Sequence, residues 1–315
     1  MTASFAPPRP GTSIAAPTAR RAPGAGLRFR KWAASVGWRH LIGLVAAAFA
    51  LFPLLYVLQS ALNPVGTVGS STNGWLSFIP THPSTHNFAA LLHSPIYPFW
   101  DWVINSLVIC TVSTFFSLFI SFAAAYAFAR MRFAGRKAGL LAVLLISIFP
   151  SFISVIALYR MSAAAGDVFP LLSPGRVSLA LVYLGGSMGV NTWLTKSYID
   201  TIPVDLDEAA MIDGASHAQI FFTLILRLAA PILVVTGLLA FIGVLNEYIF
   251  ANLFLTSGSA KTLIVGLFGL FNGGEAKNYG MFAAGALMAA VPVVVLFLVF
   301  QRYLVGGLLK GSVKY

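Results

Sequence analysis

Six long apolar segments constrain this chain more than any other feature of its sequence. Each is roughly the 20 residues that an α-helix needs to cross the hydrocarbon core of a bilayer. The runs are continuous rather than alternating, which disfavours the strands of a β-barrel. We therefore expect an all-α integral membrane protein with six transmembrane helices. The predicted spans are Leu41–Leu62, Trp102–Ala129, Ala138–Tyr159 with Pro150 inside it, Val177–Leu194 with Gly185, Gly186, Gly189 and Asn191 inside it, Pro231–Leu255 and Phe282–Leu304.

The composition supports the same class. Of 315 residues, 58% are hydrophobic and only 9% are charged, whereas a soluble domain carries about 25% charged residues. So few charges could not cover the surface of a soluble domain of this size. The single cysteine, Cys110, excludes a disulfide framework and a Cys-rich metal site. We expect no metal to be bound by the chain.

The basic residues predict the orientation of the chain. The N-terminal tail holds seven Lys or Arg residues, and the 63–101 segment holds none. With six spans, 16 of the 20 basic residues fall on one side of the membrane. Because basic loops stay in the cytoplasm, both termini are expected there. The net charge of +11 is then a topology signal, and we expect no nucleic acid as a partner.

Two parts of the chain differ in composition. Residues 1–38 are rich in Ala, Pro, Gly and Arg, so we expect a disordered basic cytoplasmic tail. Residues 39–315 form the predicted transmembrane domain. Within it, a loop at about 196–230 and a tail at about 305–315 are expected to lie on the cytoplasmic side.

The 196–230 loop has strong local signals. Asp205 followed by Glu208 predicts a helix start, with Asp205 as the N-cap. Gly214 stands where a left-handed residue would end that helix. Ser216 followed by Gln219 predicts the start of a second helix. The loop is therefore predicted to contain a short helix, a glycine turn and a second helix, all outside the bilayer.

This loop has two further interpretations. It could be an amphipathic helical turn on the surface that has no partner. It could also be an acidic metal site of a Mg²⁺-dependent membrane enzyme, because four carboxylates cluster there: Asp205, Asp207, Glu208 and Asp213. The chain has no phosphate-binding P-loop and no Ser-His-Asp arrangement, so we expect no catalytic residue and no ATP hydrolysis by the chain itself.

The segment Glu208-Ala209-Ala210, three residues and Gly214 resembles the EAA loop of ABC importer permeases. The family continues with an apolar residue, a spacer, leucine and proline; here Leu224 and Leu226 are present, but Arg227 stands at the proline position and Pro231 comes four residues later. The resemblance implies a type I, MetI-like fold in which this loop is a coupling helix that docks on an ATP-binding subunit. The contact residues it implies are Glu208, Ala209, Ala210, Asp213, Gly214 and Ala215.

Other segments are similar to the smaller permease of the maltose/maltodextrin type of carbohydrate importer. They are residues 125–133, Tyr183–Gly186, Trp193–Ile202 and Gln301–Lys314. In that family the C-terminal tail reaches the ATPase dimer interface, which implies ATPase contacts for Gly311, Ser312, Val313 and Lys314.

The resemblance also implies the partners and the location. It implies a second homologous permease, two ATP-binding subunits and a periplasmic or lipid-anchored sugar-binding protein, together with membrane lipid, in the bacterial cytoplasmic membrane. ATP and Mg²⁺ would be bound by the ATP-binding subunits, and no cofactor by this chain. Maltose or maltodextrin is the implied cargo; another disaccharide, a sugar alcohol or a glycerol-phosphate-type solute is the alternative.

A few polar residues lie inside the predicted spans. Glu247 is the only carboxylate within one, and a buried ionisable residue in a membrane is a candidate functional residue. It could line a sugar path with Asn246 and Tyr248, or it could pair with a polar group of a partner helix and only hold the dimer together. Asn191 is a further candidate for the path, although it, like Asn105, could instead form an interhelical hydrogen bond.

Overall fold

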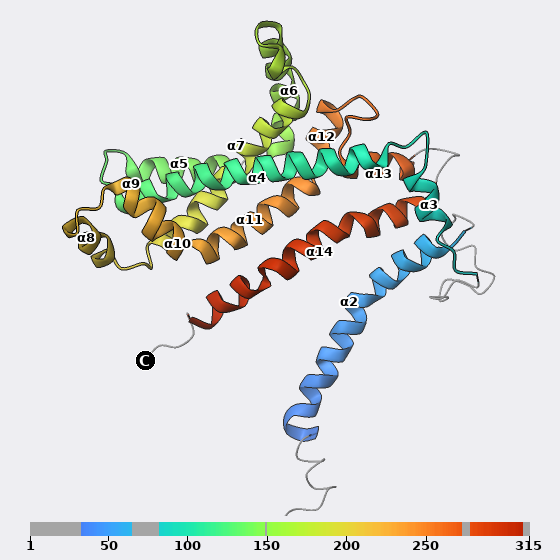
Figure 1. The fold of residues 1–315 in the computed structure, drawn as a ribbon, viewed down its shortest axis with the longest axis horizontal. Coiled ribbons are helices and arrows are strands. Elements are labelled where there is room, and N and C mark those ends of the chain that lie inside the picture. Colours follow the sequence, from blue (N-terminus) through green and yellow to red (C-terminus); the bar gives the residue numbers. More distant parts are fainter. Residues whose placement is uncertain (1–32, 65–81, 149, 273–277, 311–315) are drawn as a thin grey trace, which may run out of the picture. The chain divides into compact units, whose positions relative to one another are not determined.

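The computed structural model describes residues 33–64, 82–148, 150–272 and 278–310, and the structural statements below refer to these residues. They form helices joined by short connections, with no strand in the described ranges (Figure 1). The chain divides into two compact units between Leu54 and Leu55. The described part of the first unit holds the π-helical turn η1 (Ala33–Gly37) and most of α2 (Trp38–Leu62). Residues 33–38 of the predicted tail are therefore helical, and residues 1–32 lie outside the described residues.

Three described helices are long and apolar enough to cross a membrane. They are Ser35–Leu62, Phe99–Arg130 and Tyr279–Gln301, and they contain the first, second and most of the sixth predicted spans. The second is α4 (Phe99–Arg130), and the third lies in α14 (Tyr279–Lys310). These three predictions required only an uninterrupted apolar run, which is the strongest signal in a membrane sequence.

Three further segments qualify only as bent pairs. The segments α5 (Arg136–Ile148) and α6 (Ser151–Val168) meet at 99° at a break that contains Pro150. Helix α7 (Arg176–Ile199) bends by 44° between Gly186 and Met188. Within the described residues, the predicted number of six is reached only when each bent pair counts as one span. The six-span count and the cytoplasmic termini stay predictions.

The fifth predicted span, Pro231–Leu255, is wrong as a continuous helix. Helix α11 (Ala230–Leu245) ends before Asn246, and a separate short helix α12 (Ile249–Phe254) follows. The third bent pair instead joins residues 217–228 to α11 at 75°. Hydropathy did not reveal the break because the residues on both sides of it are apolar.

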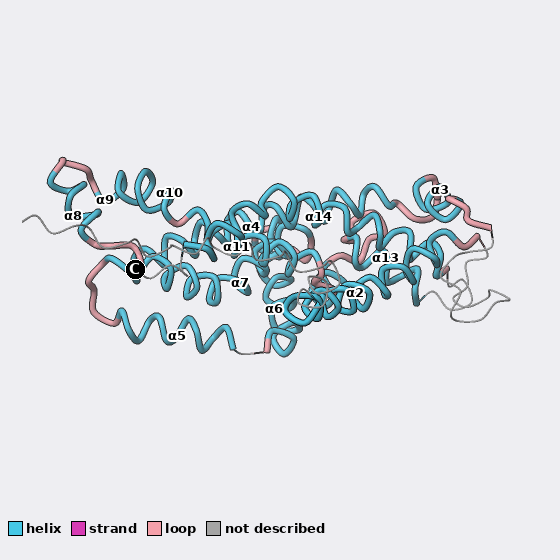
Figure 2. Tube along the Cα trace, turned by 90° about the horizontal axis from the view of Figure 1, so that it is seen from below, coloured by secondary structure: helices cyan, strands magenta, loops and turns pink. Residues whose placement is uncertain are grey.

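Small polar side chains pack α4 against α7. Along α4, buried serines recur every four residues at Ser113, Ser117 and Ser121. The Ser113 hydroxyl donates to the carbonyl of Ala180 at 3.4 Å, and the Ser121 hydroxyl donates to that of Met188 at 3.3 Å. Small residues let helix backbones approach closely in a membrane. The two helices accordingly run side by side in both views (Figures 1 and 2).

Shorter elements close the two ends of the second unit. At one end, helices α3 (His86–Leu92) and α13 (Leu263–Asn272) pack with α14 (Figure 1). The buried Asn87 amide of α3 donates to the carbonyls of Ala61 and Asn63 at 2.9 and 2.8 Å. At the other end of α4 lie α8 (Asp205–Ile212), α9 (His217–Gln219), the π-helical η3 (Ile220–Ile225) and α10 (Leu226–Leu228).

Candidate functional site

The predicted glycine turn is present after α8. Gly214 has φ +85°, a left-handed conformation that glycine adopts without steric cost. The Gly214 N–H donates to the carbonyl of Met211 at 3.0 Å, and the Ala215 N–H donates to that of Ala210 at 2.9 Å. This pair of hydrogen bonds is a Schellman motif, which satisfies the carbonyls at the end of a helix. The motif reverses the chain sharply after only eight helical residues.

The predicted start of the second helix is also present. The Gln219 N–H donates to the Ser216 hydroxyl at 3.3 Å, and the Ser216 N–H donates to the Gln219 side-chain oxygen at 2.7 Å. The two bonds form the capping box that this spacing predicts. We call the segment from Asp205 to Gln219 the elbow.

The predicted N-cap role of Asp205 is wrong. The helix already includes Asp205, Val204 occupies the N-cap position, and no side chain caps this end. Asp205, Asp207 and Glu208 all lie in the first turn, where negative charge interacts favourably with the helix dipole.

An ion pair that the sequence did not reveal anchors the elbow. The Arg130 Nε at the end of α4 lies 2.5 Å from Asp207 Oδ2, and Arg130 Nη2 donates to the carbonyl of Ile202 at 2.9 Å. Asp207 is 3% exposed and is the only buried residue of α8. In the sequence, Arg130 is one of the basic residues that predict the orientation and lies in the 125–133 segment of the resemblance, and neither observation predicts an ion pair. An arginine at the end of a long apolar helix could have indicated a functional residue, but no local pattern predicts its partner 77 residues away.

Four of the six predicted contact residues face outward. Glu208, Ala209, Asp213 and Gly214 are exposed, and Ala210 and Ala215 are half-buried. Large apolar side chains of α8 are exposed beside them, with Ile212 at 87%. An exposed apolar surface on a short helix that is fixed from behind by a buried ion pair is typical of a protein interaction site.

A buried apolar cluster packs against the elbow. Its buried members come from α4, from the end of α7 and the turn after it, and from η3 and the residue before α11, and Ala210 and Ala215 pack against it. Phe221 packs against Phe122 and Tyr126 of α4 at ring-centroid distances of 4.7 and 5.2 Å, tilted to the first ring and edge to face with the second. The buried members are Phe122, Ala125, Tyr126, Ile199, Ile202, Ile220, Phe221, Ile225 and Ala229.

The second predicted site, Asn246 to Tyr248, forms the break between α11 and α12. The Asn246 side chain donates to the carbonyl of Ile242 at 2.9 Å and closes the end of α11. The Glu247 carboxylate accepts the N–H groups of Phe250 at 3.0 Å and Ala251 at 3.1 Å, and it accepts the Tyr183 hydroxyl of α7 at 2.6 Å. Glu247 therefore has an interhelical partner within this chain, and its predicted role in holding a dimer together stays a prediction. A role of these three residues in a sugar path stays a prediction.

Asn105 and Asn191, which lie in the second and fourth predicted spans, have different surroundings. Asn105 donates to the carbonyls of Ser259 at 2.8 Å and Lys261 at 3.0 Å, so it binds a connection rather than another helix. Asn191 of α7 is 7% exposed, and its amide nitrogen has no hydrogen-bond partner within the described residues. Its path role stays a prediction.

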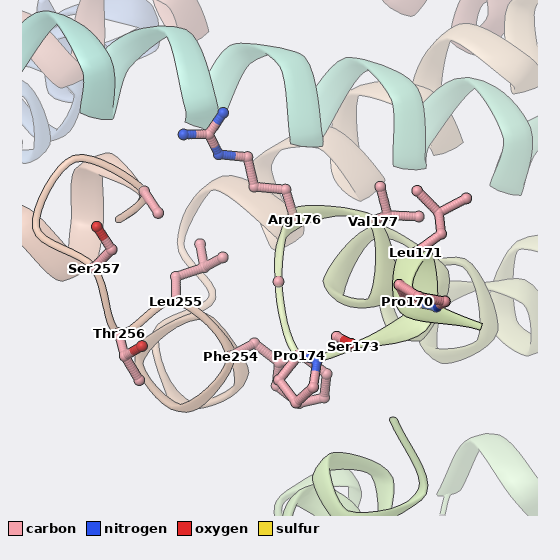
Figure 3. Close-up of a pocket in the computed structure, with 12 residues that line it drawn as sticks. Pro170, Leu171, Ser173, Pro174, Arg176, Val177, Phe254, Leu255, Thr256 and Ser257 are labelled. Carbon is pink, nitrogen blue, oxygen red and sulfur yellow. The ribbon is translucent and has the colours of Figure 1, made fainter. Parts of the chain in front are cut away.

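A cavity of about 450 Å³ lies near the end of α4 opposite the elbow. One wall is η2 (Pro170–Leu172) with the connection that leads into α7. The other wall is the segment from Phe254 to Ala260 (Figure 3). The predicted ATPase contacts Gly311, Ser312, Val313 and Lys314 lie outside the described residues.

Residues 98–308 match the family described as "Binding-protein-dependent transport system inner membrane component". The chain belongs to this family of inner-membrane transport permeases, so it is a transport component and not an enzyme in itself. The match includes the elbow, the break at Glu247 and both walls of the cavity. This family membership replaces the alternative interpretation of the acidic loop as the metal site of a membrane enzyme.

Similar proteins come from several bacteria. The chain is 36% identical over 276 residues to the galactooligosaccharides transport system permease protein GanQ of Bacillus subtilis, which covers 87% of this chain and 94% of that protein. It is 36% identical over 291 residues to the maltose/maltodextrin transport system permease protein MalG of Escherichia coli, with 87% and 94% covered. These relatives agree with the resemblance to maltose-type permeases.

A solved structure shares the fold. A chain of a bacterial ABC transporter involved in the import of the acidic polysaccharide alginate matches with a TM-score of 0.68 and 22% identity, covering 89% of this chain and 98% of that chain. At this identity the match supports the fold alone.

Proposed function

We propose that this chain is a permease subunit of an ABC sugar importer that carries maltodextrin-like oligosaccharides across the inner membrane. The identity of about a third or more to permeases of maltose, maltodextrin and galactooligosaccharide systems supports an oligosaccharide cargo. Among these, the resemblance in residues 125–133 and in the C-terminal segment favours the maltose type.

The elbow is the proposed contact with an ATP-binding subunit, and this contact carries the proposal. Glu208, Ala209 and Gly214 are exposed on a rigid, glycine-ended helix, and the apolar Ile212 stands free beside them. The small side chain of the exposed Ala209 leaves room for a close approach. ATP and Mg²⁺ belong to that partner, and this chain supplies the surface that the partner moves.

The remaining partners follow from the same proposal. A second homologous permease completes the pathway, and a sugar-binding protein delivers the cargo from outside. Closure of the ATPase dimer and the loaded binding protein would both favour one state of the spans. Each shifts the equilibrium only by its preference for that state.

Uptake measurements test the cargo. In a strain that lacks the chromosomal copy of this gene, we expect uptake of radiolabelled maltotriose to be restored by the gene on a plasmid. Galactobiose, a sugar alcohol and glycerol 3-phosphate serve as the competing solutes. Restored uptake of one of these, without maltotriose uptake, would contradict the maltodextrin assignment.

Purification tests the partners. A mild-detergent preparation through a tag on this chain should contain a second multi-span permease and an ATP-binding subunit, identified by mass spectrometry. It should hydrolyse ATP, which this chain by itself should not do. A tagged chain that carries out solute flux without either subunit would contradict the proposal.

A further inference from the structure

Within the described residues, one polar contact joins helix α8 to the other helices. Asp207 is its only buried residue, and Arg130 is the only donor that the structure gives this carboxylate, because Asp207 Oδ1 has no partner in the described ranges. A buried carboxylate that loses its cation is left uncompensated, which is far costlier than losing an exposed pair. The ion pair is therefore the one polar link between α8 and α4, beside the apolar packing of Ala210 and Ala215 against the cluster that includes Phe122 and Tyr126.

Helix α4 is an uninterrupted helix from that point to the opposite end of the unit. It runs from Phe99 to Arg130 over 32 residues, without an internal proline. At 1.5 Å per residue it is about 48 Å long. In Figure 1 it runs from the region of α8 and α9 to that of α3 and α13.

The first turns of α4 hold another segment by hydrogen bonds. The Trp102 indole N–H donates to the carbonyl of Gly258 at 2.8 Å, and Asn105 donates to those of Ser259 and Lys261. The Ser106 hydroxyl accepts the N–H of Leu263 at 2.7 Å. The residues just before this segment, Thr256 and Ser257, form a wall of the 450 Å³ cavity (Figure 3).

We propose that α4 is a rigid connector between the elbow and the cavity wall. The Arg130–Asp207 pair attaches it to α8, and Trp102, Asn105 and Ser106 attach it to segment 258–263. Displacement of α8 then moves the cavity wall without any contact between the two. Arg130, Asp207 and Asn105 are positioning residues for this movement. The proposal rests on the proposed function, because it takes α8 as the element that the ATP-binding subunit moves.

Two spin labels report separately on the movement of α8 and on the movement of the cavity wall. One replaces the exposed Asp205 at the start of α8, and the other replaces the exposed Ser257 at the cavity wall. The labels are attached to introduced cysteines in a Cys110→Ala background and measured by electron paramagnetic resonance. The sample is the complex that co-purifies with this chain, in lipid nanodiscs, with and without ATP and vanadate. In the otherwise unaltered complex, both labels should change their spectra with ATP and vanadate.

Arg130→Gln should prevent a movement of α8 from reaching the cavity wall. The label at position 205 should still respond to ATP and vanadate, and the label at 257 should not. Uptake of maltotriose should fall by at least about tenfold, because the variant leaves Asp207 buried and unpaired. Arg132→Gln is the matched control, because it removes the same charge from an exposed residue only two positions away. Both labels should respond in this variant.

Asn105→Leu tests the other attachment and does not touch the ion pair. The label at 205 should respond fully, and the label at 257 should respond less than in the unaltered complex, because Trp102 and Ser106 keep their hydrogen bonds to the segment. This variant decides the question if Arg130→Gln does not assemble. A full response at 257 in Arg130→Gln or in Asn105→Leu, or no response at 257 in the unaltered complex, overturns the connector. No response at 205 in the unaltered complex overturns the proposed docking of α8, and the connector with it.

Discussion

The elbow and the break at Glu247 are both places where a carboxylate meets the end of a helix, yet they use it differently. In the elbow, Asp207 pairs with a cation from another helix and leaves the neighbouring side chains exposed. In the break, Glu247 accepts two backbone N–H groups and the Tyr183 hydroxyl. The first arrangement leaves the outer surface of the elbow exposed, as the proposed docking requires, whereas the second satisfies groups that a break in an apolar segment leaves unpaired.

The difference between the two regions predicts different consequences of mutation. Changes in the elbow should remove transport while the complex remains assembled. Changes at the break should reduce the stability of the protein.

The largest effect should come from Gly214→Asp. Gly214 has φ +85°, and a Cβ at this position would have nothing within 4 Å, so the side chain fits the folded chain and meets only a docked partner. We expect maltotriose uptake to fall at least about tenfold, since a strained left-handed residue costs about 1–2 kcal/mol and the new charge would face the proposed ATP-binding subunit. Transport assays and co-purification of the subunits measure the two effects.

Gly135→Asp is the matched control for this change. Gly135 has φ +83° and equally open surroundings, but it lies in the turn between α4 and α5, outside the elbow. It should retain most of the uptake. Equal loss in both variants would mean that backbone strain, and not the elbow surface, causes the defect.

Glu247→Ala should have the next largest effect, on stability. It removes the acceptor of three hydrogen bonds, and leaving such groups unpaired costs about 1–3 kcal/mol. Thermal unfolding of the purified complex should show a lower midpoint. If both the unfolding midpoint and uptake are unchanged, Glu247 has neither the structural nor the functional role considered for it.

Tyr183→Phe should have the smallest effect. It removes one of the three donors to Glu247 and keeps the ring in its buried cluster. A single hydrogen bond contributes about 0.5–1.5 kcal/mol, so the midpoint should fall by less than in Glu247→Ala, with uptake retained. A larger loss than in Glu247→Ala would show that the tyrosine hydroxyl has a role apart from the carboxylate.

The two regions also show what the sequence can predict. The turn at Gly214 and the capping box of Ser216 and Gln219 were predicted because each depends on residues at most five apart. The Arg130–Asp207 and Tyr183–Glu247 pairs join residues 77 and 64 apart. They depend on how α4 and α7 pack, which no local pattern specifies.

The spans divide in the same way. Uninterrupted apolar helices were located well, but the break after Leu245 was not. There, side chains of Asn246 and Glu247 replace the backbone hydrogen bonds of a helix, and average hydropathy does not register that exchange. The predicted N-cap at Asp205 is wrong because the helix already includes Asp205. The acidic residue of this turn that has a partner is Asp207, which pairs with the distant Arg130.

The central claim, that the elbow binds a separate ATP-binding subunit, is tested most directly by photo-crosslinking from Ile212. A photoreactive amino acid there, at an 87% exposed position, should form a covalent adduct with the ATP-binding subunit in intact cells. The same amino acid at Ile146 of α5, which is 74% exposed, should not. Absence of the adduct from Ile212, in a complex that imports maltotriose at its normal rate, would contradict the claim.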